Sequence, residues 1–503
     1  MDLDISDGQL SRFSDFIDER MGLHFPPQRW PNLQRGVAAA SVEFGFEDVP
    51  ACIQWLMSGT LTKAQVEILA SSLTVGETYF FRERKSFEIL TDHVLPALIR
   101  SRPGHERRLR VWSAACCTGE EPYSVAILLH QTIADLKDWN LTILATDINP
   151  RFLRKAAAGV YGRWSFRDTP GWISDRYFKK TADGHFEIVP EIKRMVSFAH
   201  LNLVEDVYPS LTNGTNAMDV IFCRNVLMYF SPRQVGKVIQ KLYRAQAEGG
   251  WLVVSPSESS HVYRPYLTIN FPGVILYRRD GSETPSTDAA SVENESLASE
   301  QASGAEPAAS LQEMVAEPPE GQTPADPIQQ SETADPGPTS YTEAAALYEQ
   351  GRYAEATERL MKSVSGSSPQ AQVFNLLARA LANQGKLAEA LDWCDQGIAA
   401  DKLDPSAHYL RAIVLQEQGA VENAIDSLQR ALYLKQDFVL AHFALANLAR
   451  RGGKIKTADK HLTNALELLR GCQHEAVLPE SEGITAGRLA EIIISLMKSE
   501  TLG

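Results

Sequence analysis

The stretch LRVWSAACCTGEEPYSVAILL, residues 109–129, decides the fold of the central part of the chain. It opens with an apolar run of strand length, passes through small residues to Gly119, and continues as a helical stretch from Tyr123. Such a turn presents backbone N–H groups to a ligand at the start of the helix. The stretch therefore predicts a β-strand and a helix joined by a ligand-binding turn.

Further apolar runs of strand length follow, separated by helical stretches: LTILAT at 141, DVIFC at 219, WLVVS at 251 and VILYR at 274. This alternation predicts a Rossmann-like α/β domain with a mainly parallel sheet, which we place at residues 81–280. Short, turn-rich pieces at residues 163–200 predict an inserted antiparallel β-subdomain. Residues 1–80 show helical spacing without a convincing strand, which predicts a small all-α N-terminal domain.

The chain has 503 residues and a formal net charge of −14, which is unevenly distributed. Its length indicates about three domains. Residues 281–340 hold twelve acidic residues and eight prolines, with no basic or aromatic residue. We expect a disordered linker there, extended by self-repulsion, that keeps the neighbouring domains apart. The charge is +1 over residues 1–280 and −3 over residues 341–503, which disfavours a nucleic-acid binder but permits an acidic protein substrate.

A period of 34 residues runs through the C-terminal part of the chain. Glycines and two sets of alanines keep this register: Gly351, Gly385, Gly419 and Gly453; Ala344, Ala378, Ala412 and Ala446; Ala356, Ala390, Ala424 and Ala458. Small residues around a glycine turn let paired helices approach closely. Residues 341–472 resemble four tetratricopeptide repeats, an all-α solenoid, and we expect residues 473–503 to supply a capping helix.

Three absences narrow the class of protein. No cysteine pair has CxxC spacing, and the histidines lack metal-binding spacing, so we expect no metal site. No apolar run is long enough to span a bilayer, and the first residues are acidic rather than leader-like. These features favour a cytoplasmic protein without direct membrane insertion. Cysteines near the predicted site could suggest a thiol nucleophile, but a packing role is favoured: Cys116, Cys117 and Cys223.

Polar residues follow the predicted strands at the edge where an α/β sheet binds its ligand. Asp147 follows the second run and could accept hydrogen bonds from both hydroxyls of a ribose. Arg224 and Asn225 follow the third. The GxGxxG spacing is missing, and Glu120 and Glu121 would repel a pyrophosphate. The pattern therefore favours a cationic adenosyl ligand over a nicotinamide cofactor.

Four ordered motifs resemble the CheR family of chemotaxis-receptor glutamate methyltransferases: LTVGETYFFRE, VWSAACCTGEEPYS, ATDINPRFLRKAAAGVY and FCRNVLMYF. The resemblance covers roughly residues 8 to 280. It implies a helical N-terminal domain, an α/β domain that binds S-adenosylmethionine (SAM), and a β-subdomain that contacts the receptor. With its repeats the chain is similar to WspC-like members, which occur in biofilm-type pathways.

Carried over motif by motif, the resemblance implies that these residues contact SAM: Thr78, Arg82, Glu120, Asp147, Asn202, Leu203, Arg224 and Asn225. We also predict catalytic roles for Arg82 and Tyr229, although Tyr229 could also be an ordinary core tyrosine. Gly76 stands where many members carry Asn, so one side-chain contact is absent.

The function implied by the resemblance is methyl transfer from SAM to glutamate side chains of a methyl-accepting chemoreceptor-like protein, leaving S-adenosylhomocysteine. The short ADG turn of the β-subdomain predicts methylation that does not need a receptor tether. We expect the repeats to bind a peptide or helix of another signalling protein or of the enzyme itself. The alternatives are a catalytically inactive scaffold and a small-molecule methyltransferase.

Overall fold

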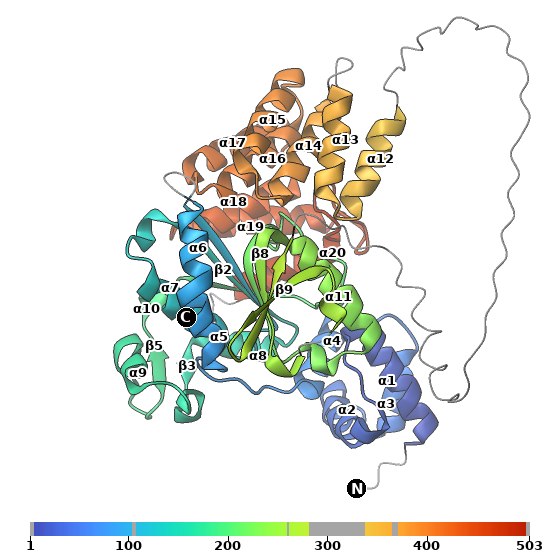
Figure 1. The fold of residues 1–503 in the computed structure, drawn as a ribbon. Helices are drawn as coiled ribbons and strands as arrows, with labels where there is room; N and C mark the ends of the chain where they lie inside the picture. Colours follow the sequence, from blue (N-terminus) through green and yellow to red (C-terminus); the bar gives the residue numbers. More distant parts are fainter. Residues whose placement is uncertain (1–4, 103–106, 259–260, 281–337, 365–370, 499–503) are drawn as a thin grey trace, which may run out of the picture.

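The computed structural model describes residues 5–102, 107–258, 261–280, 338–364 and 371–498 (Figure 1). The N-terminal helices, the α/β domain and the repeats follow one another along the chain, and the repeats lie against one end of the α/β domain. Among the described residues, no helix is long and apolar enough to cross a membrane.

The N-terminal domain is all-helical, as predicted. Its helices are α1 (Asp7–Met21), α2 (Trp30–Phe44), α3 (Val49–Met57) and α4 (Lys63–Leu73). Side-chain caps fix two of their starts: Ser6 accepts from the N–H of Gln9, and Thr62 forms a reciprocal capping box with Gln65. The apolar faces close over a common core that includes Phe13, Ile17, Leu33 and Ile53.

The central domain contains a seven-stranded sheet in the order β6-β2-β1-β7-β8-β10-β9. The strands are β1 (Arg108–Ala114), β2 (Asn140–Asp147), β6 (Val196–His200), β7 (Met218–Cys223), β8 (Gln246–Val253), β9 (Tyr266–Phe271) and β10 (Val274–Arg279). Strands β6, β2, β1, β7 and β8 run parallel, and β10 and β9 are antiparallel. The predicted α/β class is confirmed, and the carboxyl ends of the parallel strands meet at one edge.

Helices before and between the strands cover the sheet: α5 (Arg84–Ile89) and α6 (Leu95–Arg100) with the turn between them, α7 (Glu120–Thr132), α8 (Pro150–Ala158) and α11 (Pro232–Ala245). The helix α7 begins directly at Gly119, whose φ is +92°. A Cβ at this position would lie 2.7 Å from Cβ of Ala156, so the turn requires glycine.

The inserted subdomain is a small antiparallel sheet of β3 (Val160–Tyr161), β5 (Phe186–Ile188) and β4 (Phe178–Lys180), with α9 (Gly171–Tyr177) and α10 (Pro190–Lys193) beside it. The predicted range of 163–200 requires correction at both ends. β3 begins before it, and Val196–His200 pairs in parallel with β2 as the edge strand of the central sheet. The turn-rich sequence carries no signal that residues 196–200 rejoin the main sheet as a strand.

The C-terminal part forms four helix pairs, which confirms the predicted repeats. The pairs are α12 (Pro338–Glu349) with α13 (Tyr353–Val364), α14 (Ala371–Asn383) with α15 (Leu387–Ala400), α16 (Pro405–Glu417) with α17 (Val421–Leu434), and α18 (Val439–Arg451) with α19 (Ile455–Leu469). The helix α20 (Ala486–Lys498) follows. Most of the predicted linker, residues 281–337, lies outside the described residues, and residues 338–340 begin α12.

The repeats dock onto the amino ends of the central strands. Glycine turns of three pairs, Gly351, Gly385 and Gly419, lie respectively against Arg244, Arg108 and Asn140. Nearby, the buried Arg110 of β1 forms an ion pair with Glu417 of α16, whose backbone oxygen accepts from Asn140 Nδ2 at 2.6 Å. The expectation that the linker keeps the two parts apart is wrong. Linker charge carries no information about the complementary charges that the folded domains bury against each other.

Candidate functional site

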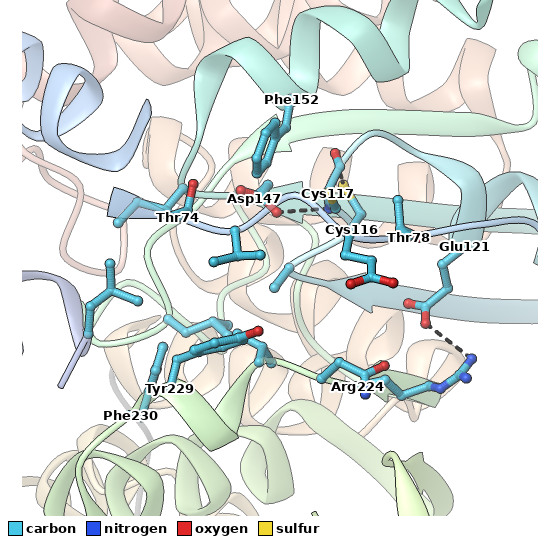
Figure 2. A pocket seen from close by; sticks show the side chains of 18 of the residues that line it. Thr74, Thr78, Cys116, Cys117, Glu121, Asp147, Phe152, Arg224, Tyr229 and Phe230 are labelled. Atoms are coloured by element: carbon cyan, nitrogen blue, oxygen red, sulfur yellow. Dashed lines mark hydrogen bonds and ion pairs between the residues drawn. The ribbon is translucent and has the colours of Figure 1, made fainter. Parts of the chain in front are cut away.

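A pocket opens where the carboxyl ends of β1, β2 and β7 meet the N-terminal helical domain (Figure 2). Eight of the nine side chains predicted from sequence line it: Thr78, Arg82, Asp147, Asn202, Leu203, Arg224, Asn225 and Tyr229. These residues come from four separate segments of the chain, and the sheet brings them to one place.

Asp147, the last residue of β2, is almost completely buried in the wall of the pocket. Its carboxylate accepts from the backbone N–H groups of Cys117 at 2.9 Å and Asn149 at 2.8 Å. Burial raises the pKa of Asp147 to about 6, although these backbone hydrogen bonds oppose the shift. The carboxylate is thereby fixed at the strand end, where it can accept from a ligand's hydroxyl groups.

The structure differs from the prediction at Glu120, which does not line the pocket. Its carboxylate accepts from Thr118 Oγ1 at 2.6 Å and from Ser165 Oγ at 3.0 Å, on the side of the β-subdomain. Glu121 lines the pocket instead. Successive residues at a helix start point about 100° apart, so the two adjacent glutamates face different surroundings.

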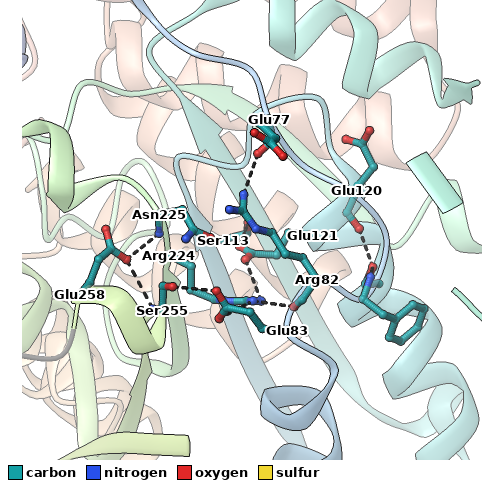
Figure 3. Close-up of polar contacts among 12 residues, drawn as sticks. Glu77, Arg82, Glu83, Ser113, Glu120, Glu121, Arg224, Asn225, Ser255 and Glu258 are labelled. Carbon is teal, nitrogen blue, oxygen red and sulfur yellow. Dashed lines mark hydrogen bonds and ion pairs between the residues drawn. The ribbon is translucent and has the colours of Figure 1, made fainter. Parts of the chain in front are cut away.

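Arg224 organises a charge network in one wall of the pocket (Figure 3). Its guanidinium lies 2.9 Å from Glu83 and 3.3 Å from Glu121, and it donates to the backbone oxygen of Arg82 at 2.5 Å. Burial raises the pKa of Glu121, and the Arg224 charge opposes this shift. Arg224 therefore holds the acidic groups and the Arg82 segment in position.

The segment that carries Arg82 forms the outer wall of the pocket. Arg82 Nη1 donates to the backbone oxygen of Glu77 at 2.8 Å, and its guanidinium lies 5.8 Å from the ring of Tyr79. A Cβ at Gly76 would lie 2.6 Å from the ring of Phe152, which also lines the pocket. The Phe152 ring therefore occupies the space that a side chain at position 76 would need.

The loop after β7 is held by Glu258, which sequence reasoning missed. The Glu258 carboxylate accepts from the backbone N–H of Asn225 at 2.6 Å (Figure 3), and from those of Val226 at 2.8 Å and Met228 at 3.2 Å. Asn225 has a φ of +56°, an unfavourable conformation for a residue with a side chain. Glu258 lies 33 residues further along the chain than Asn225, beyond the reach of any local motif.

The N-terminal domain closes the opposite side of the pocket. Asn202 Nδ2 donates to the backbone oxygen of Arg20, at the end of α1, at 2.9 Å. Tyr229 lines the pocket, and the Arg29 guanidinium lies over its ring at 5.1 Å. Arg29 also lines the pocket and was not predicted as a site residue.

Of the neighbouring cysteines, Cys116 is buried and Cys117 is half-buried. Burial raises the pKa of the Cys117 thiol to about 12 and that of Cys116 well above its ordinary value. These thiols are protonated at neutral pH, which agrees with a packing role. Among the described residues, no group of three or more His, Cys, Asp or Glu side chains could hold a metal ion.

The comparisons with known proteins agree with this geometry. The CheR methyltransferase SAM-binding domain model matches residues 76–266, and a tetratricopeptide repeat model matches residues 347–414. The chain is 31% identical over 258 residues to chemotaxis protein methyltransferase 2 of Vibrio cholerae, which covers 51% of this chain and 86% of that protein. The chain belongs to the CheR methyltransferase family.

Two further CheR relatives extend the comparison. A probable chemotaxis protein methyltransferase of Rhizobium etli is 37% identical, covering 42% of this chain and 77% of that protein. The probable biofilm formation methyltransferase WspC of Pseudomonas aeruginosa is 29% identical over 383 residues, covering 72% of this chain and 84% of that protein. The protein is thus a SAM-dependent methyltransferase with C-terminal repeats.

The residues of this CheR pocket fit SAM. Asp147 places a buried acceptor where ribose hydroxyls would bind, and Glu121 adds negative charge suited to a sulfonium cation. Arg82 also lines the pocket, and its guanidinium could pair with the carboxylate of the ligand's amino-acid end.

Proposed function

We propose that this CheR enzyme methylates glutamate side chains of a methyl-accepting chemoreceptor-like protein. The main support for this proposal is that the α/β domain and the helical N-terminal domain both contribute side chains to one pocket. The α/β domain contributes Asp147 and Glu121, and the helical N-terminal domain contributes Arg29, which stacks on Tyr229. Family membership and the names of the relatives support the same acceptor.

The reaction needs alignment more than proton transfer. When bound, SAM supplies a methyl group that passes from its sulfur to a carboxylate oxygen, leaving S-adenosylhomocysteine and a glutamate γ-methyl ester. A glutamate has an ordinary pKa of about 4.3 and is already ionised at neutral pH, so no general base is needed. Holding reacting groups in line can lower a barrier by about 7–11 kcal/mol.

The chain's residues divide this task between the two sides of the pocket. Asp147 and Glu121 would hold the nucleoside and the positive charge of SAM, and Arg82 would hold its carboxylate. We assign Tyr229 and Arg29 to the acceptor, because an arginine stacked on a tyrosine presents both a cation and a hydroxyl to an incoming carboxylate. The other residues predicted to contact SAM, Thr78, Asn202, Leu203, Arg224 and Asn225, complete the walls.

We further propose that methylation proceeds without a receptor tether. The hairpin between β4 and β5 is short, and the N–H of Thr181 closes it by donating to the backbone oxygen of His185 at 2.9 Å. This turn offers little surface to a docked peptide. Removing the last residues of the receptor should therefore leave its methylation rate unchanged, and loss of methylation on truncation would overturn this part.

The test of the function is transfer of labelled methyl groups. Full-length enzyme, SAM labelled in the methyl group and the cytoplasmic part of a candidate chemoreceptor should yield label that alkali releases as methanol, the behaviour of a carboxyl ester. Arg29→Ala should reduce this rate, while the exposed Arg35→Ala on the same domain should not. SAM binding without label transfer to any candidate receptor would favour the inactive scaffold instead.

A further inference from the structure

The repeats bury one of their faces almost completely. The first helices of the second and fourth pairs are buried over most of their surface: eight residues of α14 and eight of α18 are buried. The second helices are buried along one stripe, with four such residues in each of α17 and α19. The face made by the first helices, here called the inner face, is therefore covered.

Part of the cover comes from the C-terminal segment of the same chain. Leu478, Ile484, Leu489 and Ile493 join the hydrophobic cluster of the repeats. Ser481 is fully buried, and its hydroxyl donates within this segment, which fixes a compact turn.

The rest of the cover comes from the methyltransferase domain. Leu211 is 6% exposed and belongs to the hydrophobic cluster of the repeats rather than to that of its own domain. The Glu482 carboxylate accepts from the N–H of Leu211 at 2.7 Å, from Ser210 Oγ at 2.8 Å and from the Tyr348 hydroxyl of α12 at 2.6 Å. One carboxylate thus joins a repeat helix to the catalytic domain.

The segment that holds Leu211 also forms the cofactor pocket. It connects β6 to β7, which lie in one parallel set, so it must run from the carboxyl end of the sheet to the amino end. Asn202 and Leu203 line the pocket at its start, and the Tyr208 hydroxyl donates to the Leu203 oxygen at 2.8 Å. The connection has no helix of its own, although crossovers between parallel strands usually carry one.

A second contact reaches the same segment from α20. Arg488 Nη2 lies 2.7 Å from His200 Nδ1, at the end of β6 and two residues before Asn202. The segment is therefore held by the repeats and their capping helix near both of its ends, at His200 and at Leu211.

We propose that the repeats position the cofactor-binding segment 200–211, so that docking of their inner face onto Leu211 strengthens SAM binding. Leu211, Glu482 and Arg488 act as positioning residues, since none of them lines the pocket. This role concerns SAM alone and holds whatever the methyl acceptor is. A protein that competes for the inner face would weaken SAM binding by the factor by which SAM weakens that protein's binding.

The test measures S-adenosylhomocysteine binding to the full-length chain by calorimetry. Leu211→Ser and the milder Glu482→Gln should each raise the Kd about fivefold or more, the lower end of typical coupling between sites. Leu403→Ser, at a leucine of the repeats that is 75% exposed, is the matched control and should leave the Kd unchanged.

Hydrogen exchange of residues 204–217 in the same variants distinguishes positioning from a purely structural role. Faster exchange together with a raised Kd supports the proposal. Faster exchange with an unchanged Kd overturns it, because the segment would then be held without affecting the pocket. Unchanged exchange in Glu482→Gln also overturns it, because the contact would not restrain the segment. If Leu211→Ser does not fold, Glu482→Gln decides.

Discussion

The two ends of the central sheet use similar buried charges for different purposes. At the carboxyl end, Arg224 holds Glu83 and Glu121 around an open pocket. At the amino end, Arg110 pairs with Glu417 and closes an interface with the repeats. A buried arginine therefore does not by itself mark an active site. A binding pocket differs from a domain contact in that open space remains beside the buried ion pair.

Residues with a strained backbone, those other than glycine that have a positive φ, also gather near these two ends of the sheet. Among the described residues, eight non-glycine residues have positive φ. Five lie around the pocket: Phe81, Glu83, Ala115, Cys117 and Asn225. Of the other three, Ala217 and Glu482 lie where the repeats meet the catalytic domain, and Glu480, two residues before Glu482, pairs with Arg379 of the repeats. Each such residue costs about 1 kcal/mol or more, so the fold keeps strain at the two ends where the chain must take a defined shape.

The largest expected effect is at the amino end. Arg110→Ala leaves Glu417 buried with Arg108 as a more distant partner at 3.6 Å, and should lower the free energy of unfolding by about 3–5 kcal/mol. Chemical denaturation of the full chain measures it. Arg359→Ala, which removes an exposed ion pair with Glu343, is the control and should cost about 1 kcal/mol or less. Equal losses in the two variants would show that the interface charge is not buried in solution.

The next effect is at the carboxyl end. Asp147→Asn removes the charge of the carboxylate that we propose accepts from the ribose hydroxyls, and should weaken S-adenosylhomocysteine binding by about 1.5–3 kcal/mol, roughly 10- to 150-fold. Titration calorimetry gives the Kd directly. Asp138→Asn, at an exposed aspartate away from the pocket, should bind normally. Normal S-adenosylhomocysteine binding by Asp147→Asn would show that this pocket is not the cofactor site.

A smaller effect is expected at the loop after β7. Glu258→Gln exchanges a carboxylate that accepts from several backbone N–H groups for a weaker, uncharged acceptor. The methylation rate should fall about tenfold, while the Kd for S-adenosylhomocysteine changes less, because the loop also carries Tyr229. A drop in affinity as large as that of Asp147→Asn would mean that the loop acts mainly on the cofactor, through Asn225, and less on the acceptor.

The smallest effect is the pH dependence of cofactor binding. The pKa of Asp147 is raised to about 6, so the carboxylate is ionised at pH 7 and mostly protonated at pH 5. Protonation removes an acceptor, and the Kd for S-adenosylhomocysteine should rise up to about tenfold as the pH falls through 6. The Asp147→Asn variant should lose this part of the pH dependence. A wild-type affinity that is flat between pH 7 and 5 contradicts the assignment.

The carboxyl end could be predicted from sequence far better than the amino end. Asp147 and Arg224 directly follow apolar strands, so strand order alone predicts their meeting. Glu121 was missed by one position, because the start of a helix is not fixed by pattern to a single residue. Arg29 and Glu258 come from distant segments that no local motif joins to the pocket. Arg110 and Glu417 lie 307 residues apart, and pairing over that separation comes only from the folded structure.

Mapping the transferred methyl group tests the central claim most directly. After incubation of the full-length enzyme, SAM and the cytoplasmic part of a candidate chemoreceptor, tandem mass spectrometry of the receptor peptides should find the methyl group on glutamate γ-carboxylates. It should be absent when the Asp147→Asn variant replaces the enzyme at limiting SAM. Methyl groups on nitrogen-bearing side chains, or a receptor left unmodified by an enzyme that binds SAM normally, would contradict the account.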